Sequence, residues 1–143
     1  MNASDRETVR ARRFGWTSLF AWAAFGLFLE GAQGFRLAPF TMDELARMLV
    51  RLGHAHGVGL SLVVLAYASN GTPLLADRDD GGASTGRLLR IGAVLVPAGF
   101  AFSAIRHPEG DPNILVLAVP LGAVLLLASL ASLALAAWRK KPT

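Results

Sequence analysis

Four long apolar segments run through this chain of 143 residues, and they leave room for little besides a helical bundle embedded in a membrane. A helix that crosses a bilayer needs about 20 mostly apolar residues, because the hydrocarbon core is about 30 Å thick. The segments cover approximately residues 14–33, 42–69, 88–105 and 114–138. Charged residues form 17% of the chain and lie mostly between these segments. The sequence therefore predicts an all-α membrane protein, a single domain over residues 1–143 with four transmembrane helices.

Lysines and arginines predict the orientation of this four-helix bundle. Cytoplasmic loops of membrane proteins carry an excess of these residues. If the N-terminus is cytoplasmic, most of the 14 lysines and arginines lie on that side, and the outer side holds only Arg36, Arg47, Arg51 and Arg106. We therefore expect both termini to be cytoplasmic in a multi-pass protein of the bacterial inner membrane. The same topology accounts for the net charge of +4, so no nucleic-acid partner is expected.

Two histidines near the start of the second segment are the strongest indication of a functional site. Ionisable residues inside a membrane are rare and mark sites by default. At about 100° per residue, one stripe of this helix carries small and weakly polar side chains, which favour close helix packing. The stripe consists of Gly53, Gly57, Ser61, Val64, Tyr67 and Ala68. His54 and His56 flank the stripe on opposite sides, so each is expected to face a different neighbouring helix.

Glu30 in the first segment is the third candidate site residue. On a helical wheel with Glu30 as the origin, Leu19, Gly26 and Gln33 share its sector, so Glu30 is expected to face the bundle interior. It lies about 24 Å along the helix from Phe14 at 1.5 Å per residue, near the outer boundary of the membrane. The sequence therefore predicts a polar His/Glu site at the outer end of the bundle. A structural bridge between Glu30 and one histidine is the simpler alternative.

His107, Glu109 and Asp111 follow the third segment on the same outer side and are possible additional ligands. Imidazole and carboxylate groups suit zinc, copper or non-haem iron, and two imidazoles on different helices can ligate the iron of haem b. Side chains two residues apart on a helix point in nearly opposite directions. One histidine is therefore expected to bind the metal or haem, and the other to hydrogen-bond Glu30. For His107, solvent exposure in a short loop is the competing interpretation.

The segment Arg51-Leu-Gly-His-Ala-His-Gly-Val-Gly-Leu60 resembles the His-x-His openings of helices in two groups of membrane proteins. These are haem–copper oxidase-like proteins and related haem- and copper-containing proteins linked to nitric oxide. The resemblance covers residues 51–60 alone, and it implies that His54 or His56 ligates haem or copper, without implying an oxidase reaction. The whole chain also resembles uncharacterised small four-helix bacterial membrane proteins, which implies the fold and no activity.

Two other functions remain open. Glu30 is similar to the proton-coupling glutamate in the first helix of small multidrug transporters, although such a site is expected near the membrane midplane. Alternatively, the glycine-lined helices pack against further copies of the chain or against a larger membrane complex, and the histidines are structural. The chain has no cysteine, and no serine, histidine and acid form a recognisable hydrolytic motif. An enzymatic activity is therefore not the favoured expectation.

Overall fold

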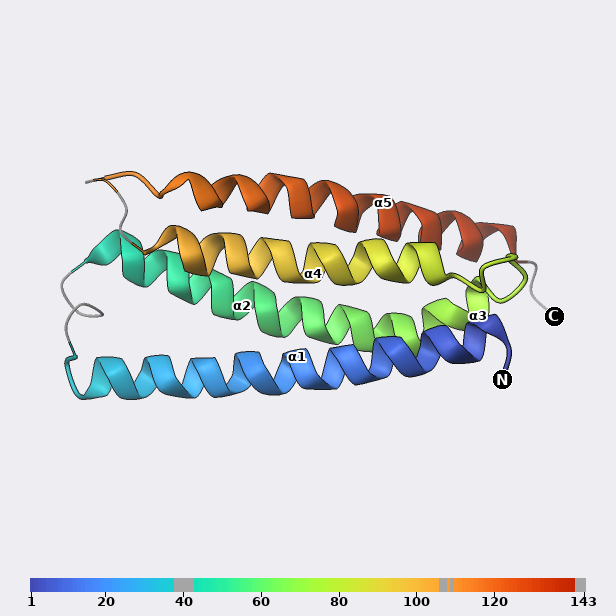
Figure 1. The fold of residues 1–143 in the computed structure, drawn as a ribbon, viewed down its shortest axis with the longest axis horizontal. Helices are drawn as coiled ribbons and strands as arrows, with labels where there is room; N and C mark the ends of the chain where they lie inside the picture. Colours follow the sequence, from blue (N-terminus) through green and yellow to red (C-terminus); the bar gives the residue numbers. More distant parts are fainter. Residues whose placement is uncertain (38–42, 106–107, 109, 141–143) are drawn as a thin grey trace.

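A computed structural model describes residues 1–37, 43–105, 108 and 110–140. Its four long helices are α1 (Ala3–Gly34), α2 (Glu44–Ala66), α4 (Ala83–Ser103) and α5 (Ala118–Arg139). Three short elements complete the fold: the π-helical turn η1 (Tyr67–Gly71), α3 (Thr72–Leu74) and the 3₁₀ turn η2 (Ile114–Leu117). The long helices lie side by side and alternate in direction (Figure 1). The prediction of an all-helical fold with four long helices is confirmed.

The two ends of the bundle differ in what they contain. The start of α1 and the end of α5 lie at one end, here called the terminal end (Figure 1). The end of α1 and the start of α2 lie at the opposite, distal end. Within the described residues, three helical segments are long and apolar enough to cross a membrane: Glu44–Leu74, Ala83–Ser103 and Ile114–Arg139. The structure is therefore consistent with a membrane protein.

Helix α1 begins eleven residues before the predicted start at residue 14. Asn2 caps it: its side-chain Oδ1 accepts the backbone N–H of Asp5 at 2.7 Å, and the Asp5 carboxylate accepts the N–H of Asn2 at 3.1 Å. This reciprocal capping box satisfies two amides that a helix start otherwise leaves unpaired. The basic segment before residue 14 is therefore the first part of a helix of 32 residues.

Helix α2 begins at Glu44, and Asp43 is its N-cap, with a side-chain oxygen that accepts the N–H of Ala46 at 3.0 Å. Its far end continues through η1 into α3. Pro73 has no N–H to donate and would clash with a carbonyl one turn earlier in a regular helix. The wider π turn, in which the Thr72 N–H donates to the Tyr67 carbonyl, comes directly before this proline. The helical segment therefore runs past residue 69, where the sequence predicted its end.

The packing face of α2 is the one that the sequence predicted. All six residues of the small stripe are buried: Gly53, Gly57, Ser61, Val64, Tyr67 and Ala68. A Cβ atom on Gly53 would lie 2.9 Å from the Pro97 carbonyl oxygen of α4, and one on Gly57 would overlap the Trp22 ring of α1. Glycine at these two positions lets α2 approach both neighbours closely, as small residues do in membrane helix pairs.

Helix α4 packs against both α2 and α5, and α1 packs chiefly against α2. Most of α5 faces outward, because Gly122 and Ser129 are its only buried residues. The hydrophobic core lies in the terminal half of the bundle, where Ala11, Val64, Leu75 and Leu89 are almost fully buried. The buried apolar core therefore lies near the terminal end, where α1, α2 and α4 converge.

Candidate functional site

His54 lies at the contact between α2 and α1, in the distal half of the bundle. Its Nδ1 atom is 2.9 Å from the backbone carbonyl oxygen of Trp22. Because a carbonyl can only accept, Nδ1 carries the proton and Nε2 of the neutral ring keeps its lone pair. The ring rests on Gly26, where an added Cβ atom would lie 2.8 Å from both ring nitrogens. His54 is therefore a half-buried imidazole with a fixed orientation and tautomer.

His56 faces a different helix, as the sequence predicted. Its ring lies 5.0 Å from the ring of Phe100 on α4, centroid to centroid. Its Nδ1 donates to the Leu52 carbonyl oxygen of its own helix at 2.8 Å, and the residue is exposed. The two histidines point to opposite sides of α2, so the expectation that they do not chelate one ion together fits this geometry.

The expectation that Glu30 faces the bundle interior is wrong, because Glu30 is exposed. The buried face of α1 consists of Glu7, Ala11, Gly15, Leu29 and Ala32. This helix carries apolar residues on every side, so hydrophobicity alone does not reveal which side packs. Using the one acidic residue of the span as the origin of the wheel turned the predicted packing face to one side of the observed face.

Glu30 nevertheless lies on the rim of the α1–α2 contact. It follows Gly26 by four residues and precedes Gln33 by three, and residues at these spacings share one helix face. Gly26 supports the His54 ring, and the Gln33 side-chain oxygen accepts a hydrogen bond from Arg51 of α2. Glu30 is therefore bracketed by two contacts between the helices. We call the exposed edge with Glu30, Gln33, Arg51 and His54 the distal rim.

Of the three loop residues expected to be additional ligands, the structure describes one. His107 and Glu109 lie outside the described residues, and Asp111 is exposed. Among the residues that the structure describes, no group of three histidine, aspartate or glutamate side chains could hold a metal ion. The described part of the distal rim thus offers one oriented imidazole and one carboxylate on the same edge.

An apolar groove of about 450 Å³ also lies in the distal half, between α1, α2 and α4. Its wall includes Trp22 and Phe25 of α1, Val50 of α2, and Ala98 and Phe102 of α4. Its size falls within the range of small-molecule sites. The residues that line it carry no ionisable group, so the groove offers space but no ligand.

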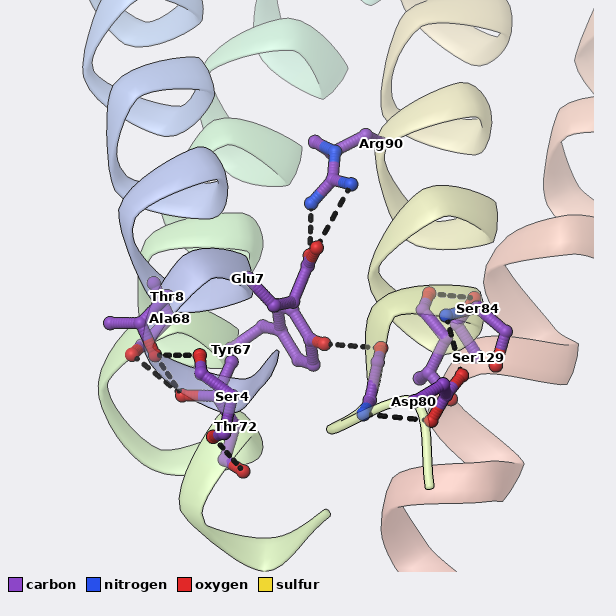
Figure 2. Close-up of polar contacts among 12 residues, drawn as sticks. Ser4, Glu7, Thr8, Tyr67, Ala68, Thr72, Asp80, Ser84, Arg90 and Ser129 are labelled. Carbon is purple, nitrogen blue, oxygen red and sulfur yellow. Dashed lines mark hydrogen bonds and ion pairs between the residues drawn. The ribbon is translucent and has the colours of Figure 1, made fainter. Parts of the chain in front are cut away.

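A second polar cluster, which the sequence analysis missed, lies at the terminal end. Arg90 of α4 donates through both terminal nitrogens to the Glu7 carboxylate of α1, with Nη2 to Oε2 at 3.4 Å (Figure 2). Glu7 is 1% exposed, and the Arg90 side chain is 18% exposed. Glycine at position 86 makes room for this pair, since a Cβ atom there would overlap Glu7 Oε1 and lie 2.8 Å from the Tyr67 hydroxyl.

Tyr67 connects this ion pair to the loop before α4. Its hydroxyl donates to the Gly82 carbonyl oxygen at 2.7 Å, and the ring is buried beside Gly86 (Figure 2). Gly82 has a φ of +87°, a left-handed conformation that a side chain would strain. The Asp80 carboxylate accepts the N–H groups of Gly82 and Ser84, each at 2.9 Å. Hydrogen bonds from Ser84 and Gly82 lower the Asp80 pKa to about 2.

Hydroxyl groups extend the terminal cluster to α1, α3, α4 and α5. Thr8 of α1 and Thr72 of α3 share a hydrogen bond at 2.7 Å. Thr85 of α4 and Ser132 of α5 are 3.1 Å apart, and Arg78 donates to Ser132 at 3.0 Å. In the described part of the chain, every buried side-chain nitrogen or oxygen has a hydrogen-bond partner. The terminal cluster is therefore fully paired and acts as a structural clamp.

The two ends thus differ in chemistry. The buried polar groups of the terminal cluster are paired with one another, whereas the distal rim holds an imidazole whose Nδ1 is engaged by a backbone carbonyl. A backbone carbonyl that fixes a histidine in this way is the usual second partner of a metal-ligating imidazole. Comparisons with family models, with curated proteins and with solved structures found no match to this chain.

Proposed function

We propose that this protein is an integral membrane protein that binds a haem or a transition-metal ion at the distal rim, with His54 as the protein ligand. The observation that carries the proposal is the hydrogen bond from His54 Nδ1 to the Trp22 carbonyl. It selects the tautomer with a lone pair on Nε2, and it holds the ring in one orientation before any metal arrives. Gly26 supports this arrangement because it leaves space for the ring.

Haem suits this site better than a bare ion. Zinc and copper sites need three or four protein ligands. A porphyrin already surrounds its iron with four nitrogens, so one axial imidazole is enough to hold it. Glu30, on the same edge as His54, is the candidate second ligand. Substitution of a residue that orients a metal ligand typically lowers the metal affinity by about 10- to 100-fold.

The proposed membrane placement has α1 as a fourth span, with both termini in the cytoplasm of a bacterium and the bundle in its inner membrane. Large apolar side chains on the outer surface of α1 support the fourth span, with Phe20 and Leu27 both more than 70% exposed. The excess of lysine and arginine on the terminal side supports the orientation. In this placement, the distal rim faces the outer half of the bilayer.

Proton-coupled transport through Glu30 has less support. A coupling carboxylate should lie inside the bundle near the midplane, where both sides of the membrane can reach it alternately. Glu30 is exposed on the outer surface of α1. The outward-facing surface of α5 would suit a structural subunit of a larger membrane complex. We would favour that role if the purified protein binds no cofactor.

The test is purification of the full chain in mild detergent from cells supplied with haem precursor, followed by absorption spectroscopy and metal analysis. We expect a haem absorption band or a stoichiometric metal, and loss of either in His54→Ala. His56→Ala is the matched control, because His56 lies two residues away and faces α4; it should retain the signal. A protein without haem or metal, or a signal lost only in His56→Ala, contradicts the proposal.

A further inference from the structure

Three arginines form an exposed stripe on the first turns of α1. Arg6, Arg10 and Arg13 follow at spacings of four and three residues, which places them on one helix face, and all three are exposed. Glu7 and Ala11 lie on the adjacent, buried side of the same turns. This part of α1 is therefore amphipathic, and the Glu7–Arg90 ion pair and the Thr8–Thr72 hydrogen bond fix it to the bundle.

Helix α4 adds a fourth cation beside this stripe. Arg87 is exposed and lies between Gly86 and Arg90, both of which contact Glu7. Arg10 is one turn from Glu7, and Arg87 is one turn from Arg90, so these two arginines flank the ion pair from opposite helices. The Glu7 carboxylate is buried and already neutralised by Arg90. An exposed positive charge therefore collects where α1 meets α4.

Apolar side chains continue the surface from Arg87 toward the membrane. Ile91 and Val94 follow Arg87 by four and seven residues on the same face of α4, and they are 42% and 48% exposed. They belong to a helix apolar enough to span a bilayer. A nucleic acid or an acidic peptide would match the arginines but would leave this apolar stripe uncovered. An anionic phospholipid matches both, with its phosphate at the arginines and its acyl chain along Ile91 and Val94.

We propose that the junction of α1 and α4 at the terminal end binds an anionic phospholipid, with Arg10 and Arg87 holding the headgroup phosphate. Guanidinium groups form paired, charge-assisted hydrogen bonds with phosphate oxygens. Each arginine near an anionic lipid surface changes binding by about fivefold, since it contributes about 1 kcal/mol. This proposal uses residues remote from His54, so it does not depend on haem or metal binding.

The experiment compares wild-type protein with Arg10→Gln/Arg87→Gln in detergent micelles doped with phosphatidylglycerol or phosphatidylcholine. Bound lipid is counted by native mass spectrometry, and thermal unfolding is followed in the same samples. Wild-type protein should retain phosphatidylglycerol in preference to phosphatidylcholine, and the double variant should bind it about 25-fold more weakly, from two fivefold effects. The preference should also weaken at high salt, because exposed charges are screened. Both substitutions are at exposed positions, so the fold should be retained.

A matched control is Arg36→Gln/Arg47→Gln, which removes two arginines at the distal end and should leave the preference unchanged. Equal retention of the two lipids by wild-type protein overturns the proposal, as does an undiminished preference in Arg10→Gln/Arg87→Gln. If inorganic phosphate alone raises the unfolding temperature as much as phosphatidylglycerol does, the site is a simple anion site. That result would also overturn the lipid proposal.

Discussion

Glu7 of α1 and Arg90 of α4 form a buried ion pair across 83 positions of the sequence. The pair lies beside Tyr67, whose hydroxyl holds the loop that begins α4. One carboxylate thereby fixes the basic start of α1 against α4 at the level where the helices converge. The arginines that surround Glu7 on α1 remain exposed.

Breaking this pair should destabilise the bundle more than replacing it. Glu7→Gln leaves the largely buried Arg90 without a counter-charge, and we expect the free energy of unfolding to fall by about 3 kcal/mol. Glu7→Leu/Arg90→Met should be more stable than Glu7→Leu or Arg90→Met alone, because no unpaired charge remains. Thermal unfolding in detergent measures both. Arg10→Gln, at an exposed position, should change stability by less than about 0.5 kcal/mol. Additive single effects would contradict a direct interaction.

Gly86 should be intolerant of any side chain. A Cβ atom there overlaps the Glu7 carboxylate and approaches the Tyr67 hydroxyl at 2.8 Å, so Gly86→Ala should destabilise by about 1–3 kcal/mol through overpacking. Gly59→Ala is the matched control, since no atom lies within 4 Å of a Cβ at that helical position. Alanine there should be neutral or slightly stabilising. Similar unfolding temperatures for the two variants would show that the side chains around Gly86 can shift to accommodate a methyl group.

The contrast between α1 and α2 shows what the sequence can predict. In α2, the small residues from Gly53 to Ala68 repeat with helical period, and small side chains in a membrane helix have one common purpose, which is close packing. Their burial and the divergent directions of His54 and His56 therefore follow from the pattern. In α1, large apolar residues surround the helix, and only contacts with α2 and α4 determine which side is buried.

The terminal cluster could not be predicted for a different reason. Glu7 lies before the apolar segment, among arginines typical of a cytoplasmic tail, and Arg90 contributes to the charge count that predicts topology. Their pairing depends on the helical start of α1 and on the space at Gly86. One signal was available: Asn2 and Asp5 have the spacing of a capping box, which would have extended the predicted helix to include Glu7.

The loop before α4 should loosen at acidic pH through Asp80. The Asp80 pKa is lowered from 3.8 to about 2 by hydrogen bonds that favour the carboxylate. A depressed pKa stabilises the native loop above about pH 4, and the stabilisation is lost as pH falls toward 2. Hydrogen-exchange protection of the Gly82 and Ser84 amides, which donate to Asp80, should fall over this range.

Asp80→Asn should show lower protection of these two amides at pH 5 and no further loss on acidification. The Leu115 amide provides an internal reference, because it donates to the neutral Asn113 side chain at 2.9 Å. Its protection should not depend on pH over the same range. A wild-type Gly82 amide that stays equally protected from pH 5 to pH 2 would show that Asp80 does not hold the loop.

Gly26 should control the proposed haem or metal site without itself offering a ligand. A side chain at Gly26 would collide with the His54 ring, so Gly26→Ala should displace the imidazole from the Trp22 carbonyl. Loss of such an orienting contact typically weakens metal affinity by about 10- to 100-fold. Gly31→Ala lies on the same helix with no atom within 4 Å of its Cβ, and it should bind as wild type. Titration with haem, monitored by absorption, measures both variants. Equal affinities would show that the orientation of His54 does not determine binding, even if His54 itself is required.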